Sequence, residues 1–153
     1  MMLLRILSRV AWGAVLLGAA HGTSAQSQPT FVGIRTFLGA PYVKNLDELK
    51  VDFAVLGVPF DEGTWGWPGE RYGPQELRER SQEYNHELTE GFYYIDGERT
   101  TLKGKRWADV GDIEVFPTVP ATTEEKITTA VRKILEKKAF PIVLGATTAF
   151  RFR

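Results

Sequence analysis

The segment VDFAVLGVPF, residues 51–60, decides the fold of this chain. The run from Val51 to Val58 is mostly apolar, with Gly57 near its end and Pro59 directly after it. This pattern is typical of a short strand buried on both faces. A second run of this kind, FPIVLG, occupies residues 140–145. Strands buried on both faces occur in parallel sheets that helices cover, so the two runs predict an α/β fold.

Helical patterns fill the sequence between these two runs. Pro74 suits the first turn of a helix, and the residues that follow it at helical spacing along one face are Leu77, Ser81, Tyr84 and Leu88. A later helix is predicted from Thr122, which forms a capping box with Glu125. Its apolar stripe consists of Ile127, Ala130, Val131, Ile134 and Leu135.

Residues 107–115, WADVGDIEV, are a further predicted strand, interrupted by a turn at Gly111. The predicted order is therefore strand, helix, strand, helix, strand. This order predicts a mainly parallel sheet of three strands, connected by two main helices through right-handed crossovers.

The beginning of the chain has the layout of a secretory signal peptide. Arg5 and Arg9 precede an apolar stretch at residues 10–20, which is too short to cross a bilayer comfortably, and small residues follow up to Ala25. We expect cleavage after Ala25, export to the periplasm or the medium, and no membrane association afterwards. An uncleaved membrane anchor is the alternative.

Charge and composition exclude several classes of function. Removal of Arg5 and Arg9 leaves 17 basic residues against 19 acidic ones, and this net charge of −2 implies no nucleic-acid partner. The chain has no cysteine, so disulfides are excluded. Outside the leader the only histidine is His86, so this chain alone cannot build a metal site mainly from imidazoles.

Three motifs follow one another along residues 36–145: VLGVPFDEGTWGWPGERYGP, ADVGDIEV and KKAFPIVLG. In order and spacing they resemble the N-terminal part of the ureohydrolase (arginase/agmatinase) family, and most closely its agmatinase branch. The resemblance implies a three-layer α/β/α fold and a homo-oligomer. It also implies a centre of two manganese ions whose bridging hydroxide attacks the guanidinium carbon of an agmatine-like substrate, giving urea and an amine.

The sequence departs from this family directly after the third predicted strand. There the resemblance implies a Gly-Gly-Asp-His motif with the first metal-ligating histidine, but residues 145–148 read GATT. The other implied ligands would follow Arg153. We therefore assign no catalytic, cofactor-binding or metal-ligating residue, and expect this chain alone to be inactive and to bind no manganese.

The expected division of the chain is a signal peptide at 1–25, an arm at 26–50, a partial ureohydrolase domain at 51–145 and an aberrant tail at 146–153. The codons that residues 145–153 require permit the family motif in another reading frame. Our hypothesis is that the tail comes from a frame-shifted or misread agmatinase-type gene, and natural truncation is the alternative.

The loop after the first strand is the candidate substrate loop, with Glu62, Trp65, Trp67 and Arg71 as its site residues. Carboxylates such as Asp61 and Glu62 pair well with a guanidinium cation, and tryptophans can stack on one. The alternative is a structural loop whose glycines permit tight turns and whose tryptophans pack against the rest of the domain. Trp67 also stands where relatives usually have arginine.

Two further groups have simpler interpretations. Asp109 and Asp112 resemble an acidic pair, but aspartates next to glycine usually bond within turns and caps. His86 is expected in solvent on the polar side of its helix.

Two other functions remain open from the sequence. One is a non-enzymatic module that binds a cationic amine or guanidine through the loop from Trp65 to Tyr72. The other is a chain that a partner chain completes.

Overall fold

The computed structural model describes residues 33–62, 64–93 and 100–145. The predicted leader, the start of the arm and the tail lie outside these residues. Within the described ranges, no helix combines the length and the apolar character that a membrane span needs.

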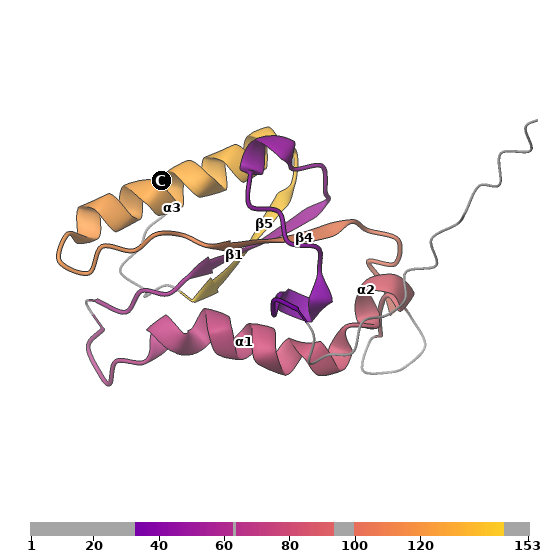
Figure 1. Cartoon of the computed structure of the whole chain (residues 1–153), viewed down its shortest axis with the longest axis horizontal. Coiled ribbons are helices and arrows are strands. Elements are labelled where there is room, and N and C mark those ends of the chain that lie inside the picture. Colours follow the sequence, from indigo (N-terminus) through magenta and orange to yellow (C-terminus); the bar gives the residue numbers. More distant parts are fainter. Residues whose placement is uncertain (1–32, 63, 94–99, 146–153) are drawn as a thin grey trace, which may run out of the picture.

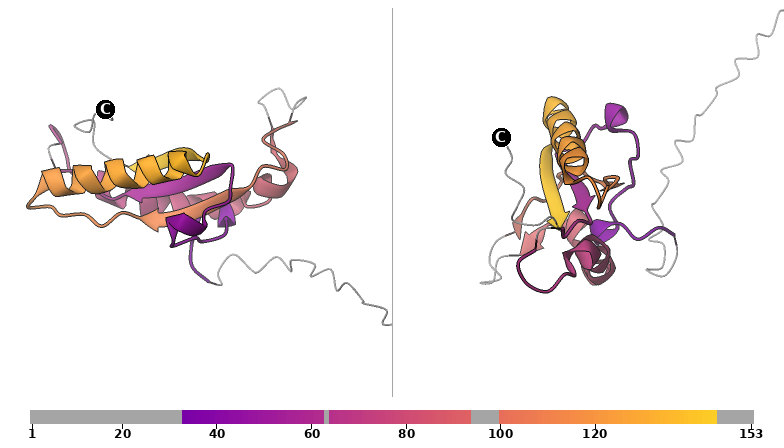
Figure 2. Two further views of the ribbon diagram at one scale, coloured as in Figure 1. Left: turned by 90° about the horizontal axis from the view of Figure 1, so that it is seen from above. Right: turned by 90° about the vertical axis from the view of Figure 1, so that its left-hand side faces the viewer.

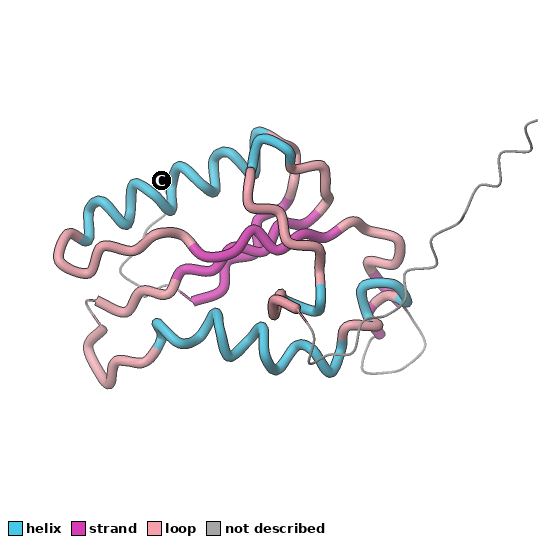
Figure 3. Tube along the Cα trace, in the orientation of Figure 1, coloured by secondary structure: helices cyan, strands magenta, loops and turns pink. Residues whose placement is uncertain are grey.

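A three-stranded parallel sheet forms the centre of the molecule (Figures 1 and 3). β1 (Phe53–Val58) is the middle strand, with β4 (Trp107–Asp112) on one side and β5 (Phe140–Gly145) on the other. Five of the six residues of β1 are buried. The predicted parallel sheet is confirmed, and the sequence pattern explains it because β1 is apolar on both faces.

Helices cover the two faces of this sheet (Figures 1 and 2). α1 (Gly73–Ser81) lies on one face, and α3 (Pro120–Glu136) lies on the other. Between α1 and β4 the chain forms the short helix α2 (Glu87–Glu90) and an antiparallel pair, β2 (Phe92–Tyr93) with β3 (Thr100–Thr101). The layers are thus helix, sheet and helix.

The apolar core lies mainly between α3 and the sheet. Ile127 and Ile134 of α3 pack there with Ala54, Leu56 and Val58 of β1. The intervening residue Val55 faces the other way and packs with Trp107 and Leu144. This alternation follows from the period of two along a strand.

The start of α3 differs from the prediction. The helix begins at Pro120, two residues before the expected Thr122, and its N-cap Val119 makes no capping hydrogen bond through its side chain. The predicted capping box is therefore wrong. Proline suits the first helical turn because its missing N–H would be unpaired there anyway.

The buried stripe of α1 also differs from the prediction. Of the predicted stripe, Ser81 is buried as expected, but Leu77 is exposed, and so is Tyr84, which lies after the end of α1. The other buried residues of the helix are Pro74 and Arg78. The helix face that packs on the sheet includes Arg78, because its guanidinium pairs there with the carboxylates of Asp109 and Asp112.

The arm lies along the outer edge of β4. Its backbone forms two hydrogen bonds with Asp109, from Val43 N to the Asp109 carbonyl at 2.9 Å and from Asp109 N to the Pro41 carbonyl at 3.0 Å. Two short 3-10 helices flank this contact, η1 (Phe37–Gly39) and η2 (Leu46–Glu48). The β4 edge of the sheet is thereby covered.

Candidate functional site

The carboxyl ends of the three strands meet at one edge of the sheet. Val58 of β1 is in register with Gly145 of β5, and Gly57 is in register with Asp112 of β4. In the strand order β4-β1-β5, the chain passes from β1 to β4 on one side of β1 and later to β5 on its other side. Such a switch of direction is where open α/β sheets bind ligands.

The end of β5 is packed closely against this edge. Gly145 has φ +84°, and a Cβ on it would lie 2.6 Å from the Val58 carbonyl oxygen and 3.1 Å from the Pro74 ring. Only glycine adopts this conformation at little cost and leaves room for both neighbours. The N-terminus of α1 and the end of β5 are thus fixed next to each other.

The loop between β1 and α1 is organised by Asp61. This residue is only 4% exposed, and its carboxylate accepts hydrogen bonds from Gly69 N at 2.8 Å and from Arg71 Nε at 2.7 Å. The hydrogen bonds from Arg71, with that from Gly69 N, hold the pKa of Asp61 below its usual range despite its burial. Asp61 therefore closes the loop as a charged anchor.

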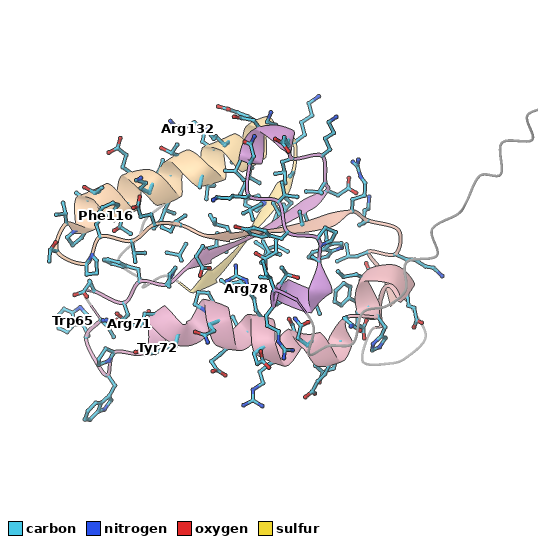
Figure 4. All side chains as sticks on the ribbon, viewed as in Figure 1. Trp65, Arg71, Tyr72, Arg78, Phe116 and Arg132 are labelled. Carbon is cyan, nitrogen blue, oxygen red and sulfur yellow. The ribbon has the colours of Figure 1, made fainter. Side chains whose placement is uncertain are left out.

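The four predicted site residues fall into two pairs. Glu62 and Arg71 come together, with 3.5 Å between Glu62 Oε1 and the Arg71 guanidinium, which also pairs with Asp61. Trp65 and Trp67 instead have fully exposed side chains, with relative exposures of 104% and 95%. Trp65, Arg71 and Tyr72 lie at one end of the molecule in Figure 4.

A buried ion network links α1 to the end of β4. Arg78 is 7% exposed, and it donates through Nε to Asp109 Oδ2 at 2.7 Å and through a second nitrogen to Asp109 Oδ1 at 2.9 Å. Its remaining terminal nitrogen donates to Asp112 Oδ1 at 2.6 Å. Burial opposes the charge of Arg78, but its hydrogen bonds with the two carboxylates outweigh this and raise its pKa.

The prediction for Asp109 and Asp112 was therefore incomplete. Asp109 does bond within its turn, accepting from Gly111 N at 2.8 Å, but its principal partner is Arg78. The sequence pattern did not reveal the role of Arg78, because the carboxylates that pair with it lie more than thirty residues further along the chain.

The described residues do not provide the ligands of a metal centre. Across the ranges 33–62, 64–93 and 100–145, no three side chains of the metal-binding types gather in one place. The two carboxylates of β4 itself, Asp109 and Asp112, bind the guanidinium of Arg78. His86, as predicted, is exposed on the surface.

A separate groove of about 490 Å³ lies beside α3. Its walls come from Leu46, Ile113, Glu114 and residues of α3. No described residue of the loop after β1 lines it, whereas Ile113 and Glu114 directly follow the carboxyl end of β4.

Comparison with known proteins identifies the family of this chain. The model of the arginase family matches residues 51–146, which is more than half of the chain. The chain therefore belongs to the arginase family, the ureohydrolases.

Within that family its relatives are agmatinases and similar hydrolases. The chain is 35% identical to putative agmatinase 1 of Schizosaccharomyces pombe, over 74% of this chain and 29% of the relative. It is 31% identical to a guanidinobutyrase of Pseudomonas aeruginosa, over 76% of this chain and 35% of the relative. The chain represents the agmatinase branch.

Solved structures show the same fold. A hypothetical agmatinase from Burkholderia thailandensis superimposes with a TM-score of 0.62 at 29% identity, over 77% of this chain and 35% of that one. The proclavaminate amidino hydrolase of Streptomyces clavuligerus gives 0.59 at 26% identity, over 76% and 36%. The chain thus has part of the ureohydrolase α/β fold and spans about a third of the length of these relatives.

Proposed function

We propose that this chain forms the N-terminal portion of an agmatinase-type ureohydrolase, which hydrolyses a guanidino compound to urea and an amine. The observation that carries this proposal is the family match over β1, β4 and β5, whose carboxyl ends assemble one edge of the expected active site. Relatives named agmatinase and guanidinobutyrase support a linear guanidinium compound as the substrate class.

The portion described here is proposed to be inactive by itself. The family resemblance implies two manganese ions, which would supply a metal-activated nucleophile. The described residues do not fit that centre, because they gather no set of ligands. Metal ligands would have to come from polypeptide that lies beside the end of β5.

We further propose that the mature protein is exported after cleavage at Ala25 and that the complete enzyme is a homo-oligomer. Export rests on the arrangement of Arg5, Arg9 and the apolar stretch that follows them. Intact-mass measurement of the protein from a secreting host should show a chain that begins at Gln26. Retention of Met1 would count against export by this route.

The direct test of the proposed function is urea release. The mature chain, incubated with manganese and agmatine, should release no more urea than a metal-free blank. Co-expression with the complementary segment of a relative, from the residue after its third strand to its C-terminus, should give urea release that depends on manganese. Hydrolysis by the chain alone would contradict the proposed need for added ligands. No hydrolysis by a soluble, metal-loaded pair would contradict the assignment as an amidinohydrolase.

One of the two alternatives is a chain that a partner chain completes, and the other is a non-enzymatic module that binds a cationic amine or guanidine. The observation that favours it is the pair of exposed tryptophans in an acidic loop. Binding of agmatine by the chain, together with no activity in any complemented form, would support this alternative.

A further inference from the structure

Trp65 and Trp67 are the most exposed large apolar side chains in the described part of the chain. Exposed tryptophan leaves a large apolar surface in water, which is unfavourable unless a ligand or partner covers it. Two such side chains separated by one residue are therefore a candidate contact surface.

The loop that carries these tryptophans has a fixed base. Asp61 accepts from Gly69 N at 2.8 Å, and its backbone carbonyl accepts from Thr64 Oγ1 at 2.8 Å. Both ends of the segment that contains the tryptophans are thus tied to one buried residue. A loop with fixed ends loses less conformational entropy when a ligand binds at its tip.

The loop also emerges at the carboxyl edge of the sheet. It begins directly after β1, whose last residue Val58 lies beside Gly145, and it ends at α1, whose Pro74 packs on the same glycine. Ligands of open α/β sheets bind at this edge. The tryptophans are therefore attached to the part of the molecule that would border a bound substrate.

The charge of the loop favours a cation. It has three carboxylates, Asp61, Glu62 and Glu70, against one guanidinium, Arg71. Arg71 is held by Asp61 and Glu62, and Glu70 is exposed. A negative loop with two indole rings attracts organic cations both by net charge and by the negative faces of the rings.

We propose that Trp65 and Trp67 form an aromatic contact for the cationic group of a linear alkylguanidine or alkylamine, with Glu70 as the counter-charge. The inference rests on the proposed function because that function places a guanidino compound at this edge. It assigns Trp65 and Trp67 as specificity-determining residues. Arg71 is a positioning residue, which acts by holding Asp61 and Glu62.

The test uses the mature chain without metal, so that it does not depend on hydrolysis. The indole N–H signals of the tryptophans are followed by NMR during titration with butylguanidinium and, separately, with butylurea, which is its uncharged isostere. The signals of Trp65 and Trp67 should shift saturably with butylguanidinium alone, and the signal of buried Trp107 should not move. A second readout is the quenching of indole fluorescence by acrylamide, which bound butylguanidinium should reduce. It is measured at submicromolar chain concentration, where aggregation is slow.

Variants assign the effect to the two rings. Trp65→Ala with Trp67→Ala should weaken butylguanidinium binding about tenfold or more, and replacement of both by phenylalanine should weaken it less. Tyr84→Ala removes an exposed aromatic ring elsewhere and should leave the affinity unchanged.

Three results would overturn the inference: no saturable shift, equal shifts with butylurea, or self-association of the chain that the double alanine variant abolishes. The last result would assign the tryptophans to an interface between copies. The urea assay of the complemented enzyme is independent, so failure of binding here and failure of the proposed hydrolysis are distinguishable.

Discussion

The two outer strands of the sheet differ in what covers them. β4 has the arm along its outer edge, and the backbone of Asp109 is hydrogen-bonded there to Pro41 and Val43. β5 pairs with β1, and among the described residues no strand lies on its other side. Its first residue, Phe140, is 63% exposed. The strand carries no charged residue that would protect an exposed edge.

This difference distinguishes a covered edge of the sheet from an open one. Natural edge strands are protected by charges, bulges or covering segments, because unpaired backbone groups recruit other strands. β4 has such protection, whereas the sequence FPIVLG of β5 is suited to burial in the interior of a sheet. The β5 edge is thus the place at which the rest of a ureohydrolase sheet would join, in a chain that spans about a third of its relatives.

The largest expected effect comes from breaking the β4 side of the sheet at its ion network. Arg78→Ala should lower the free energy of unfolding by about 3–5 kcal/mol, because it leaves the buried Asp109 carboxylate without its partner. Urea denaturation measures the change. Arg80→Ala is the control, since the side chain of Arg80 is 81% exposed and its loss should cost less than about 0.5 kcal/mol. Equal losses for both variants would show that the network adds little.

A second substitution tests the joint between β5 and α1. Gly145→Ala should destabilise the chain by roughly 1–3 kcal/mol, since it combines a positive φ with a Cβ too close to the Val58 carbonyl. Gly66→Ala is the matched control, because a Cβ there meets no atom within 4 Å. Thermal unfolding of the two variants should differ clearly, and a neutral Gly145→Ala would refute the close packing.

A third prediction concerns aggregation through the β5 edge. Phe140→Lys adds a charge at the start of this strand and should slow aggregation severalfold, since charges block strand addition. Leu77→Lys adds the same charge on exposed α1 and should have a smaller effect. Light scattering over time compares them. If both variants slow aggregation equally, net charge and not the edge is responsible.

The smallest expected effect is on pH dependence. The pKa of Asp61 is below its unfolded value of about 3.9, so its ion pair stabilises the fold above that pH and is lost as pH falls through the folded pKa. Asp61→Asn should therefore flatten the loss of stability below about pH 4. Asp47→Asn, at an exposed aspartate, should keep the wild-type profile. If Asp61→Asn loses stability below about pH 4 as steeply as the wild type does, Asp61 does not anchor the loop through its charge.

Much of this architecture could be predicted from the sequence because it depends on local periodicity. The runs around Val55 and Ile142 are apolar on both faces, so a parallel sheet with helical connections follows directly. The ion network could not be predicted in this way, because a buried Arg78 depends on Asp109 and Asp112, which are more than thirty residues away. A charged residue in a helical pattern is normally assigned to the surface, and for this reason Arg78 was not predicted on the buried face of α1.

The candidate site was predicted only in its composition. The sequence identified the loop of Glu62, Trp65, Trp67 and Arg71, but not the role of Asp61 as its anchor. That role depends on the backbone N–H of Gly69, and glycine spacing alone does not reveal which carboxylate such a donor meets.

Hydrogen exchange at the two sheet edges tests the central claim most directly. Phe140 N donates toward the β1 side, to the Asp52 carbonyl, so the alternation along a strand directs the N–H of Val143 to the open edge. In the mature chain alone, the Val143 amide should exchange much faster than the Asp109 amide, which is bonded to the arm at the opposite edge. Addition of the complementary segment of a relative should slow exchange at Val143 and leave Asp109 unchanged. Equal protection of Val143 and Asp109 in the chain alone would contradict the claim that β5 is the open joint of an incomplete ureohydrolase sheet.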